Sequence, residues 1–108
     1  MSRRNIQREA APQIVADVRM YETSDGGRAT PALPGWGCPL IVSKSQPISG
    51  WDALPLLRDD PLRPGESRRL GFVFLSRDEA IAAITRAGRF YLWEGRVIGE
   101  ATVVPNGS

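Results

Sequence analysis

Glycine and proline interrupt this chain so often that most of the segments between them are too short for a long helix. The 108 residues include 11 glycines and 9 prolines, and the intervening segments are rich in Val, Ile, Leu and aromatic side chains. Short apolar segments separated by turn-forming residues are typical of proteins built from several β-strands. A chain of this length can bury one hydrophobic core without disulfides. We therefore predict a single, mainly β domain.

Apolar and polar residues alternate along several of these segments. In residues 14–21, for example, Ile14, Ala16 and Val18 fall on one face, and the same alternation recurs in residues 67–75. A period of two indicates a strand with one buried side. Alternation, or apolar content alone, predicts strands at residues 14–21, 40–42, 51–57, 67–75, 90–93 and 97–104.

One segment has the spacing of a helix instead. Ser76 followed by Glu79 is the pattern of a capping box, and Gly88 is a helix-ending residue. The apolar residues between them recur at helical spacing, at Ala80, Ile81, Ile84 and Ala87. We expect a short helix at residues 77–87.

Six strands, one short helix and tight turns favour a small closed antiparallel barrel, because closure removes the exposed edges of a free sheet. We assign the barrel to residues 13–104, with Phe72 and Phe90 in its core. Residues 1–12 are mostly polar and read as a flexible arm, and residues 105–108 as a frayed tail.

Few chemical groups in the sequence suit catalysis or metal binding. The chain has no histidine and one cysteine, Cys38. This excludes histidine-activated nucleophiles, histidine-ligated metals and a four-cysteine zinc site within one chain. The acidic pairs at residues 59–60 and 78–79 are explained by a turn and by the first turn of the helix. We predict a protein that is not an enzyme and has no metal or cofactor.

The same features indicate where the protein works. A single cysteine permits no intrachain disulfide and suits a reducing cytoplasm. No apolar segment approaches the length of a membrane span, and the charged first residues do not form a secretory signal. We expect a cytoplasmic protein without a membrane partner.

Three motifs occur in order along the chain: Asp25-Gly26-Gly27-Arg28-Ala29-Thr30-Pro31 with Gly35-Trp36, then Pro64-Gly65-Glu66, then the hairpin segment from Gly88 to Gly99. Together they resemble the C-terminal (third) β-barrel domain of translation elongation factor Tu over roughly residues 14–104. The phosphate loop that ends in Gly-Lys-Ser or Gly-Lys-Thr occurs nowhere, so the resemblance implies a stand-alone barrel without the GTPase domain, and no nucleotide.

The resemblance also implies candidate contact residues. In that family the Gly-Gly-Arg loop helps to form the surface that holds the T-stem of aminoacyl-tRNA. The positions that match its RNA-facing edge are Arg28, Lys44, Ser45, Glu94, Gly95 and Arg96. Trp93 joins them, because it alternates away from Phe90 and Leu92 and is therefore expected to face outward, where it could contact a protein or a base.

Two functions fit these residues. The first is a non-enzymatic binding module with a protein partner, favoured by the low net charge of +2 and by Ala29, which replaces a histidine of the family motif. The alternative is binding of a tRNA-like RNA stem through Arg28, Lys44 and Arg96, which would then converge at one end of the barrel.

Overall fold

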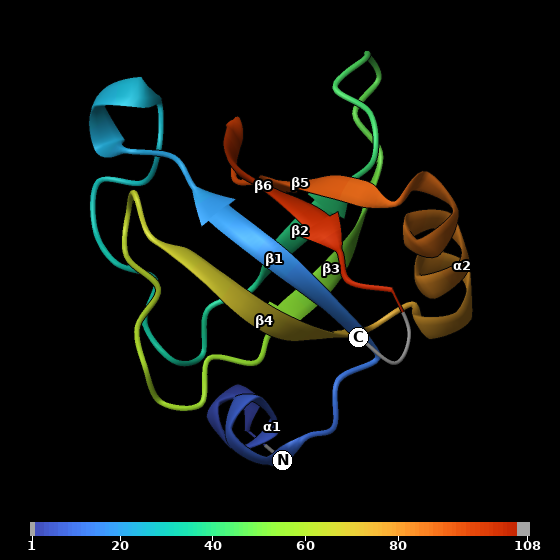
Figure 1. Cartoon of the computed structure of the whole chain (residues 1–108), viewed down its shortest axis with the longest axis horizontal. Helices are drawn as coiled ribbons and strands as arrows, with labels where there is room; N and C mark the ends of the chain where they lie inside the picture. Colours follow the sequence, from blue (N-terminus) through green and yellow to red (C-terminus); the bar gives the residue numbers. More distant parts are fainter. Residues whose placement is uncertain (1, 106–108) are drawn as a thin grey trace.

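Six antiparallel strands close into a barrel in the computed structural model, which describes residues 2–105 (Figure 1). The strands are β1 (Ile14–Met20), β2 (Cys38–Ile41), β3 (Gly50–Pro55), β4 (Ser67–Phe74), β5 (Arg89–Trp93) and β6 (Val97–Val103). Their order around the barrel is β1-β4-β3-β2-β5-β6. The predicted fold class is confirmed, and each predicted strand corresponds to one of the six. Of the predicted frayed tail, residues 106–108 lie outside the described residues.

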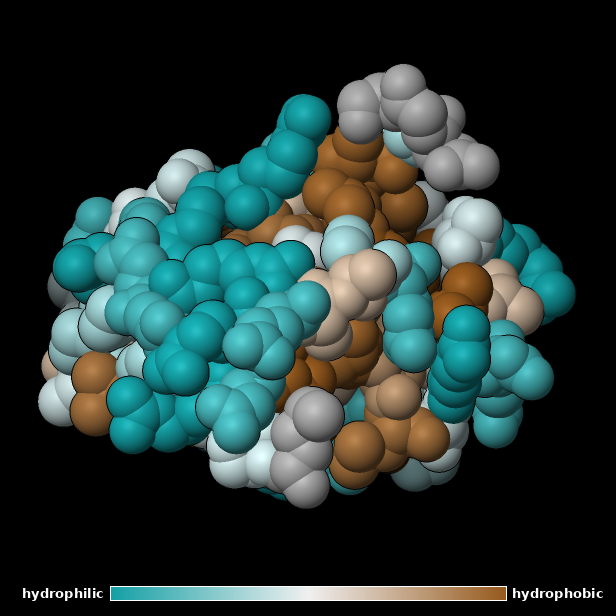
Figure 2. All heavy atoms as spheres, turned by 90° about the horizontal axis from the view of Figure 1, so that it is seen from below, coloured by the Kyte–Doolittle hydropathy of each residue, from teal (hydrophilic) through white to brown (hydrophobic). Residues whose placement is uncertain are grey.

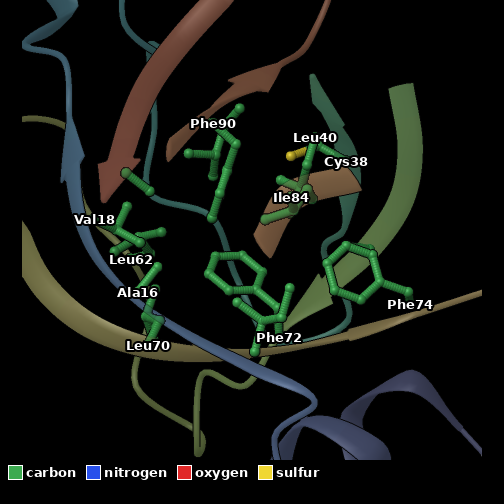
Figure 3. Packing of buried hydrophobic residues seen from close by; sticks show 14 of the residues in the cluster. Ala16, Val18, Cys38, Leu40, Leu62, Leu70, Phe72, Phe74, Ile84 and Phe90 are labelled. Atoms are coloured by element: carbon green, nitrogen blue, oxygen red, sulfur yellow. The ribbon is translucent and has the colours of Figure 1, made fainter. Parts of the chain in front are cut away.

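The inward-facing side chains fill the barrel (Figure 3). Phe72 and Phe90 lie at its centre, almost fully buried, and their rings meet edge to face with centroids 5.3 Å apart. Cys38 is also buried in this core, and the burial raises the pKa of its thiol to about 12. The thiol therefore stays protonated at neutral pH and serves as a packed side chain.

The helix α2 (Arg77–Ala87) has the predicted bounds and packs against β4 and β5. It places Ala80 and Ile84 in the core and ends at Gly88, whose φ of 75° is left-handed. The predicted capping box is wrong, because the side chain of Ser76 forms no capping hydrogen bond. Its backbone, with φ −101° and ψ 76°, lies outside the extended conformation usual for a capping residue.

A second helix, α1 (Arg3–Glu9), occupies the segment predicted as a flexible arm. Its anchor is Gln7, whose side chain is 1% exposed. The Gln7 amide donates to the carbonyls of Trp36 and Pro55, at 2.7 and 2.9 Å, and accepts a hydrogen bond from the Gly35 N–H. The segment predicted as an arm is therefore a helix. The sequence did not predict it, because a helix held by a polar side chain shows no periodic apolar residues.

The turn after β3 holds the other end of α1. The guanidinium of Arg58 donates to the carbonyls of Arg8 and Ala10, and Arg8 forms two hydrogen bonds to the carboxylate of Asp59. Arg58 and Asp59 both have positive φ, 52° and 65°, a conformation that is uncommon outside glycine. The side of the molecule on which α1 lies is largely hydrophilic, with hydrophobic atoms exposed between the polar side chains (Figure 2).

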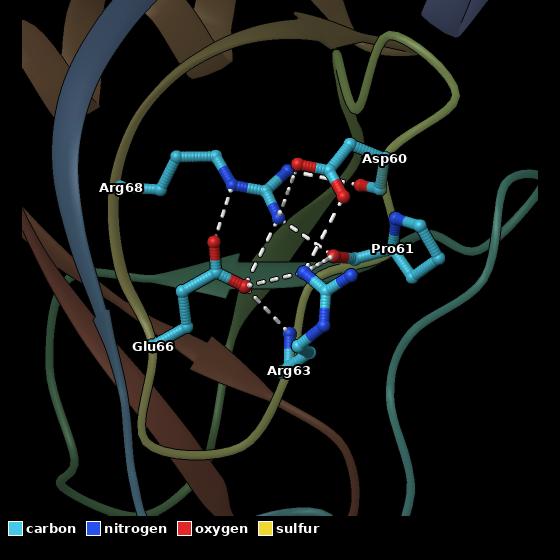
Figure 4. A network of polar contacts seen from close by, with 5 residues as sticks. All are labelled: Asp60, Pro61, Arg63, Glu66 and Arg68. Carbon is cyan, nitrogen blue, oxygen red and sulfur yellow. Dashed lines mark hydrogen bonds and ion pairs between the residues drawn. The ribbon is translucent and has the colours of Figure 1, made fainter.

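A network of charged side chains fixes the loop that leads into β4 (Figure 4). Arg68 donates to the Glu66 carboxylate at 2.8 Å and to the Pro61 carbonyl at 2.6 Å. Hydrogen bonding to Arg68 lowers the pKa of Glu66. Arg63 and Asp60 form a further ion pair at 3.3 Å. All these groups bond within one loop and the start of β4, so the network is structural.

Candidate functional site

The loop between β1 and β2 contains the Gly-Gly-Arg motif and begins with the 3-10 turn η1 (Thr23–Asp25). Gly26 ends this turn with a φ of 96°, as the sequence predicts for a tight turn. A Cβ on Gly27 would lie 2.1 Å from the backbone oxygen of Tyr21. The first glycine therefore supplies a left-handed conformation, and the second permits a close backbone contact that any larger residue would prevent.

Arg28, which follows these glycines, has a side chain that is 16% exposed. Its guanidinium forms an ion pair with Glu94 at 2.5 Å and donates to the Thr30 carbonyl at 3.1 Å. It also lies over the ring of Trp36, 5.2 Å from the centroid. Three groups of the same chain thus surround this cation.

The hairpin between β5 and β6 completes the arrangement. Glu94 accepts hydrogen bonds from Arg28 and from the Trp36 indole, the latter at 2.9 Å. Arg96 donates to the carbonyls of Gly26 and Gly27 at 2.6 and 3.0 Å. We call Arg28, Trp36, Glu94 and Arg96 the loop clasp, because they join the β1–β2 loop to this hairpin. Gly95 lies between the two charged hairpin residues with a φ of 74°.

Lys44 and Ser45 lie elsewhere, in the exposed loop between β2 and β3. The Lys44 ammonium is 4.5 Å from the centroid of the Tyr91 ring on β5, and the Ser45 N–H donates to the hydroxyl of Ser43. Within residues 2–105, no hydrogen bond or ion pair joins Lys44 to the loop clasp. Arg28 and Arg96 therefore share one contact network, and Lys44 contacts a different part of β5.

Trp93 is half-buried on the outer side of β5. Burial alternates along this strand, so that Phe90 and Leu92 face the core while Arg89, Tyr91 and Trp93 face outward. Two of these three outward residues, Arg89 and Tyr91, were not among the candidates from the sequence. Their signal is the same alternation that placed Trp93.

A hollow of about 280 Å³ lies on this outer side, across β1, β6 and β5. We call it the outer hollow; its lining residues with polar side chains are Asp17, Arg19, Lys44, Arg89, Tyr91, Glu100 and Thr102. Hydrogen bonding to Arg69 lowers the pKa of Asp17. Burial and the hydrogen bond to Glu100 raise the pKa of Tyr21, which flanks the hollow beside Arg19. The sequence could not place these residues together, because non-local strand pairing joins them.

No family model and no curated protein matches the chain. None of the helices in residues 2–105 is long and apolar enough to cross a membrane. The same part of the chain has no cluster of three or more His, Cys, Asp or Glu side chains that could hold a metal ion.

Proposed function

We propose that this chain is a non-enzymatic binding module whose partner is a protein. One observation carries the proposal: the arginines of the loop clasp are engaged by groups of their own chain. Arg28 is enclosed by Glu94, Trp36 and Thr30, and Arg96 donates to two backbone carbonyls. This edge therefore serves to hold a loop in place, and rigid loops on a barrel are common binding surfaces.

The same observation disfavours the alternative, an RNA stem held by Arg28, Lys44 and Arg96. Affinity for RNA depends on cations that reach phosphates and displace counterions. Glu94 already neutralises Arg28, and its carboxylate would repel a phosphate at this edge. Lys44 is exposed but contacts Tyr91, away from the clasp.

The resemblance to the C-terminal barrel of elongation factor Tu supports the proposal at the level of architecture. A closed six-stranded antiparallel barrel is compatible with that domain, and the Gly-Gly-Arg motif has a clear role here in loop geometry. Folds of this kind carry many functions, so the barrel alone does not assign one. The proposal keeps from the family the idea of a binding module and not its RNA ligand.

Fluorescence anisotropy with a labelled tRNA-derived stem tests the choice between protein and RNA. We expect no binding at about 50 mM salt with protein near 100 μM, which exceeds much of the usual range of non-specific dissociation constants. Binding with a log–log salt slope of about −2 to −3, made shallower by one unit in Arg28→Ala and in Lys44→Ala, would establish the RNA alternative. Arg77→Ala, on the exposed start of α2, is the matched control.

A second experiment tests for the protein partner. Tagged protein captures partners from the native host with and without ribonuclease, and Trp93→Ala is compared with Leu75→Ala, which truncates a side chain that is 69% exposed. We expect a protein that survives ribonuclease, is lost with Trp93→Ala and is kept with Leu75→Ala. Recovery of RNA alone would contradict the proposal.

A further inference from the structure

The outer hollow is bordered by residues from strands that are distant in the sequence. Register places Arg69, Asp17, Thr102 and Arg89 in one row across β4, β1, β6 and β5, and Ser67, Arg19, Glu100 and Tyr91 in the next. All point to the outer side, since the alternate residues of β1 and β5 fill the core. A second hollow of about 320 Å³ adjoins the first across β1, and both contain Asp17 and Arg19.

The acidic residues of this surface already have partners. Asp17 accepts two hydrogen bonds from Arg69, at 2.8 and 3.1 Å. Glu100 accepts a hydrogen bond from the Tyr21 hydroxyl at 3.0 Å and pairs with Arg19 at 3.2 Å. Both carboxylates are therefore balanced within the sheet.

Two cations of the outer hollow are not balanced in this way. Lys44 and Arg89 form no ion pair with any carboxylate of residues 2–105, although eight ion pairs occur there. Both line the hollow together with Tyr91, and the Lys44 ammonium lies over that ring. The hollow thus has an excess of positive charge next to an aromatic surface, which suits a carboxylate flanked by apolar groups.

We propose that the outer hollow binds an extended acidic segment of a partner protein, with Lys44 and Arg89 receiving its carboxylates. This deepens the proposed function and rests on it, because it names the surface and the chemistry of the protein partner. The three strands that the outer hollow crosses span about 10 Å, which an extended segment of about three residues matches. Charge complementarity therefore determines the sign of the ligand's charge, and the width of the outer hollow determines the length of the bound segment.

Nucleic acid fits the outer hollow less well than an acidic peptide. Asp17 and Glu100 line the same hollow, so phosphates held in a nucleic-acid backbone would also lie near carboxylates. The Lys44 ammonium already covers Tyr91, and a base could stack on that ring only by displacing it. The carboxylates of an acidic peptide are carried on flexible side chains, so they can turn toward the two cations and away from the acidic positions.

The first test uses a fluorescein-labelled hexaglutamate peptide at about 50 mM salt, with hexauridylate of the same length as the phosphate probe. We expect hexaglutamate to bind and hexauridylate to bind more weakly. Arg89→Glu and Lys44→Glu should each weaken hexaglutamate binding at least about fivefold, the equivalent of one charged contact of about 1 kcal/mol. Arg77→Glu, which changes the net charge by the same amount at the start of α2, should change it less than about twofold. Thermal melting of each variant checks that the barrel is intact.

NMR titration locates the bound peptide. We expect amide shifts at Arg89, Tyr91 and Glu100, and none at Gly26 or Gly27 in the loop clasp. Equal weakening by Arg77→Glu would mean that only net charge matters and would overturn the proposal. Absence of hexaglutamate binding up to about 1 mM, where the binding free energy is near −4 kcal/mol, would also overturn it.

The remaining outcomes separate this inference from the proposed function. If a captured protein partner is lost with Trp93→Ala but kept with Arg89→Glu and Lys44→Glu, the chain binds a protein partner and the outer hollow is not the binding site. If hexauridylate binds the hollow more tightly than hexaglutamate, the acidic-segment proposal fails, and the capture experiment still decides whether the partner is a protein.

Discussion

At the scale of single residues, Gln7 determines where α1 lies. Its amide satisfies three backbone groups, from Gly35, Trp36 and Pro55, at a site almost closed to water. We expect Gln7→Ala to lower the free energy of unfolding by about 2–3 kcal/mol, because buried polar groups lose their partner. Urea denaturation measures the loss. Asn5→Ala on the exposed side of the same helix is the control, and equal unfolding midpoints for the two variants would contradict the role assigned to Gln7.

Phe72 and Phe90 are the largest fully buried side chains of the core, and their rings meet edge to face. Phe72→Ala should lower the free energy of unfolding by about 3–5 kcal/mol, since it removes the ring and leaves a cavity. The exposed Leu75, which directly follows the same strand, should tolerate alanine with a change within about 0.5 kcal/mol. A loss below about 1 kcal/mol for Phe72→Ala would mean that the centre of the barrel collapses around the missing ring.

At the scale of elements, the ion pair between Arg8 and Asp59 joins α1 to the turn after β3. The hydrogen bond from Arg8 lowers the pKa of Asp59 below its ordinary value. A carboxyl whose pKa is lower in the folded state stabilises the fold at pH values above its unfolded pKa, and this stabilisation is lost as the pH falls through the folded value.

Thermal unfolding of wild type and Asp59→Asn at several pH values tests this contact. Asparagine also tolerates the left-handed backbone of this position, so the variant removes the charge and keeps the turn. We expect the wild type to be more stable at pH 7, with the difference shrinking below about pH 4 and vanishing under the folded pKa. Asn5→Ala, at an exposed position of α1, changes no titratable group and should show no such convergence. A difference that is constant from pH 7 to pH 2 would exclude an electrostatic contribution.

The elements differ in how far the sequence predicts them. The strands and α2 were predictable because their apolar residues recur with a period of two or at helical spacing, as at Phe72 and Ile84. No such period marks α1, a helix of seven residues held by tertiary hydrogen bonds through Gln7. The spacing of apolar residues along the sequence indicates which apolar side chains are buried, but it does not indicate a buried polar side chain such as that of Gln7.

The candidate site was predictable only in part. Sequence placed Arg28 and Arg96 in two turn motifs, and the structure joins those turns through the loop clasp. That the guanidiniums are engaged by Glu94 and by backbone carbonyls depends on side-chain geometry that no spacing contains. The outer hollow was missed because strand pairing between β1, β6 and β5 brings its residues together. The register of that pairing cannot be predicted from any one segment of the sequence.

At the scale of the whole molecule, the barrel is closed unevenly. Six residue pairs join β1 to β4, whereas β2 and β5 are joined by two, Leu40 with Leu92 and Ile41 with Tyr91. We expect this short junction to open locally at a lower free energy than the rest. Native-state hydrogen exchange by NMR should show faster exchange for backbone amides of β2 and β5 at the junction than for those of β1. Exchange as slow as in β1 would mean that the barrel opens only by global unfolding.

The position of β1 also has a consequence for how the protein is made. This strand lies between β4 and β6, so one of its two edges depends on the last strand of the barrel. A ribosome adds about 5–20 residues per second, and β6 is therefore completed roughly 1–6 s after β4. During that interval a nascent chain can pair β1 with β4 but leaves its other edge bare. Such an edge attracts foreign strands, so the interval between the synthesis of β4 and that of β6 is the period in which this barrel most needs protection from aggregation.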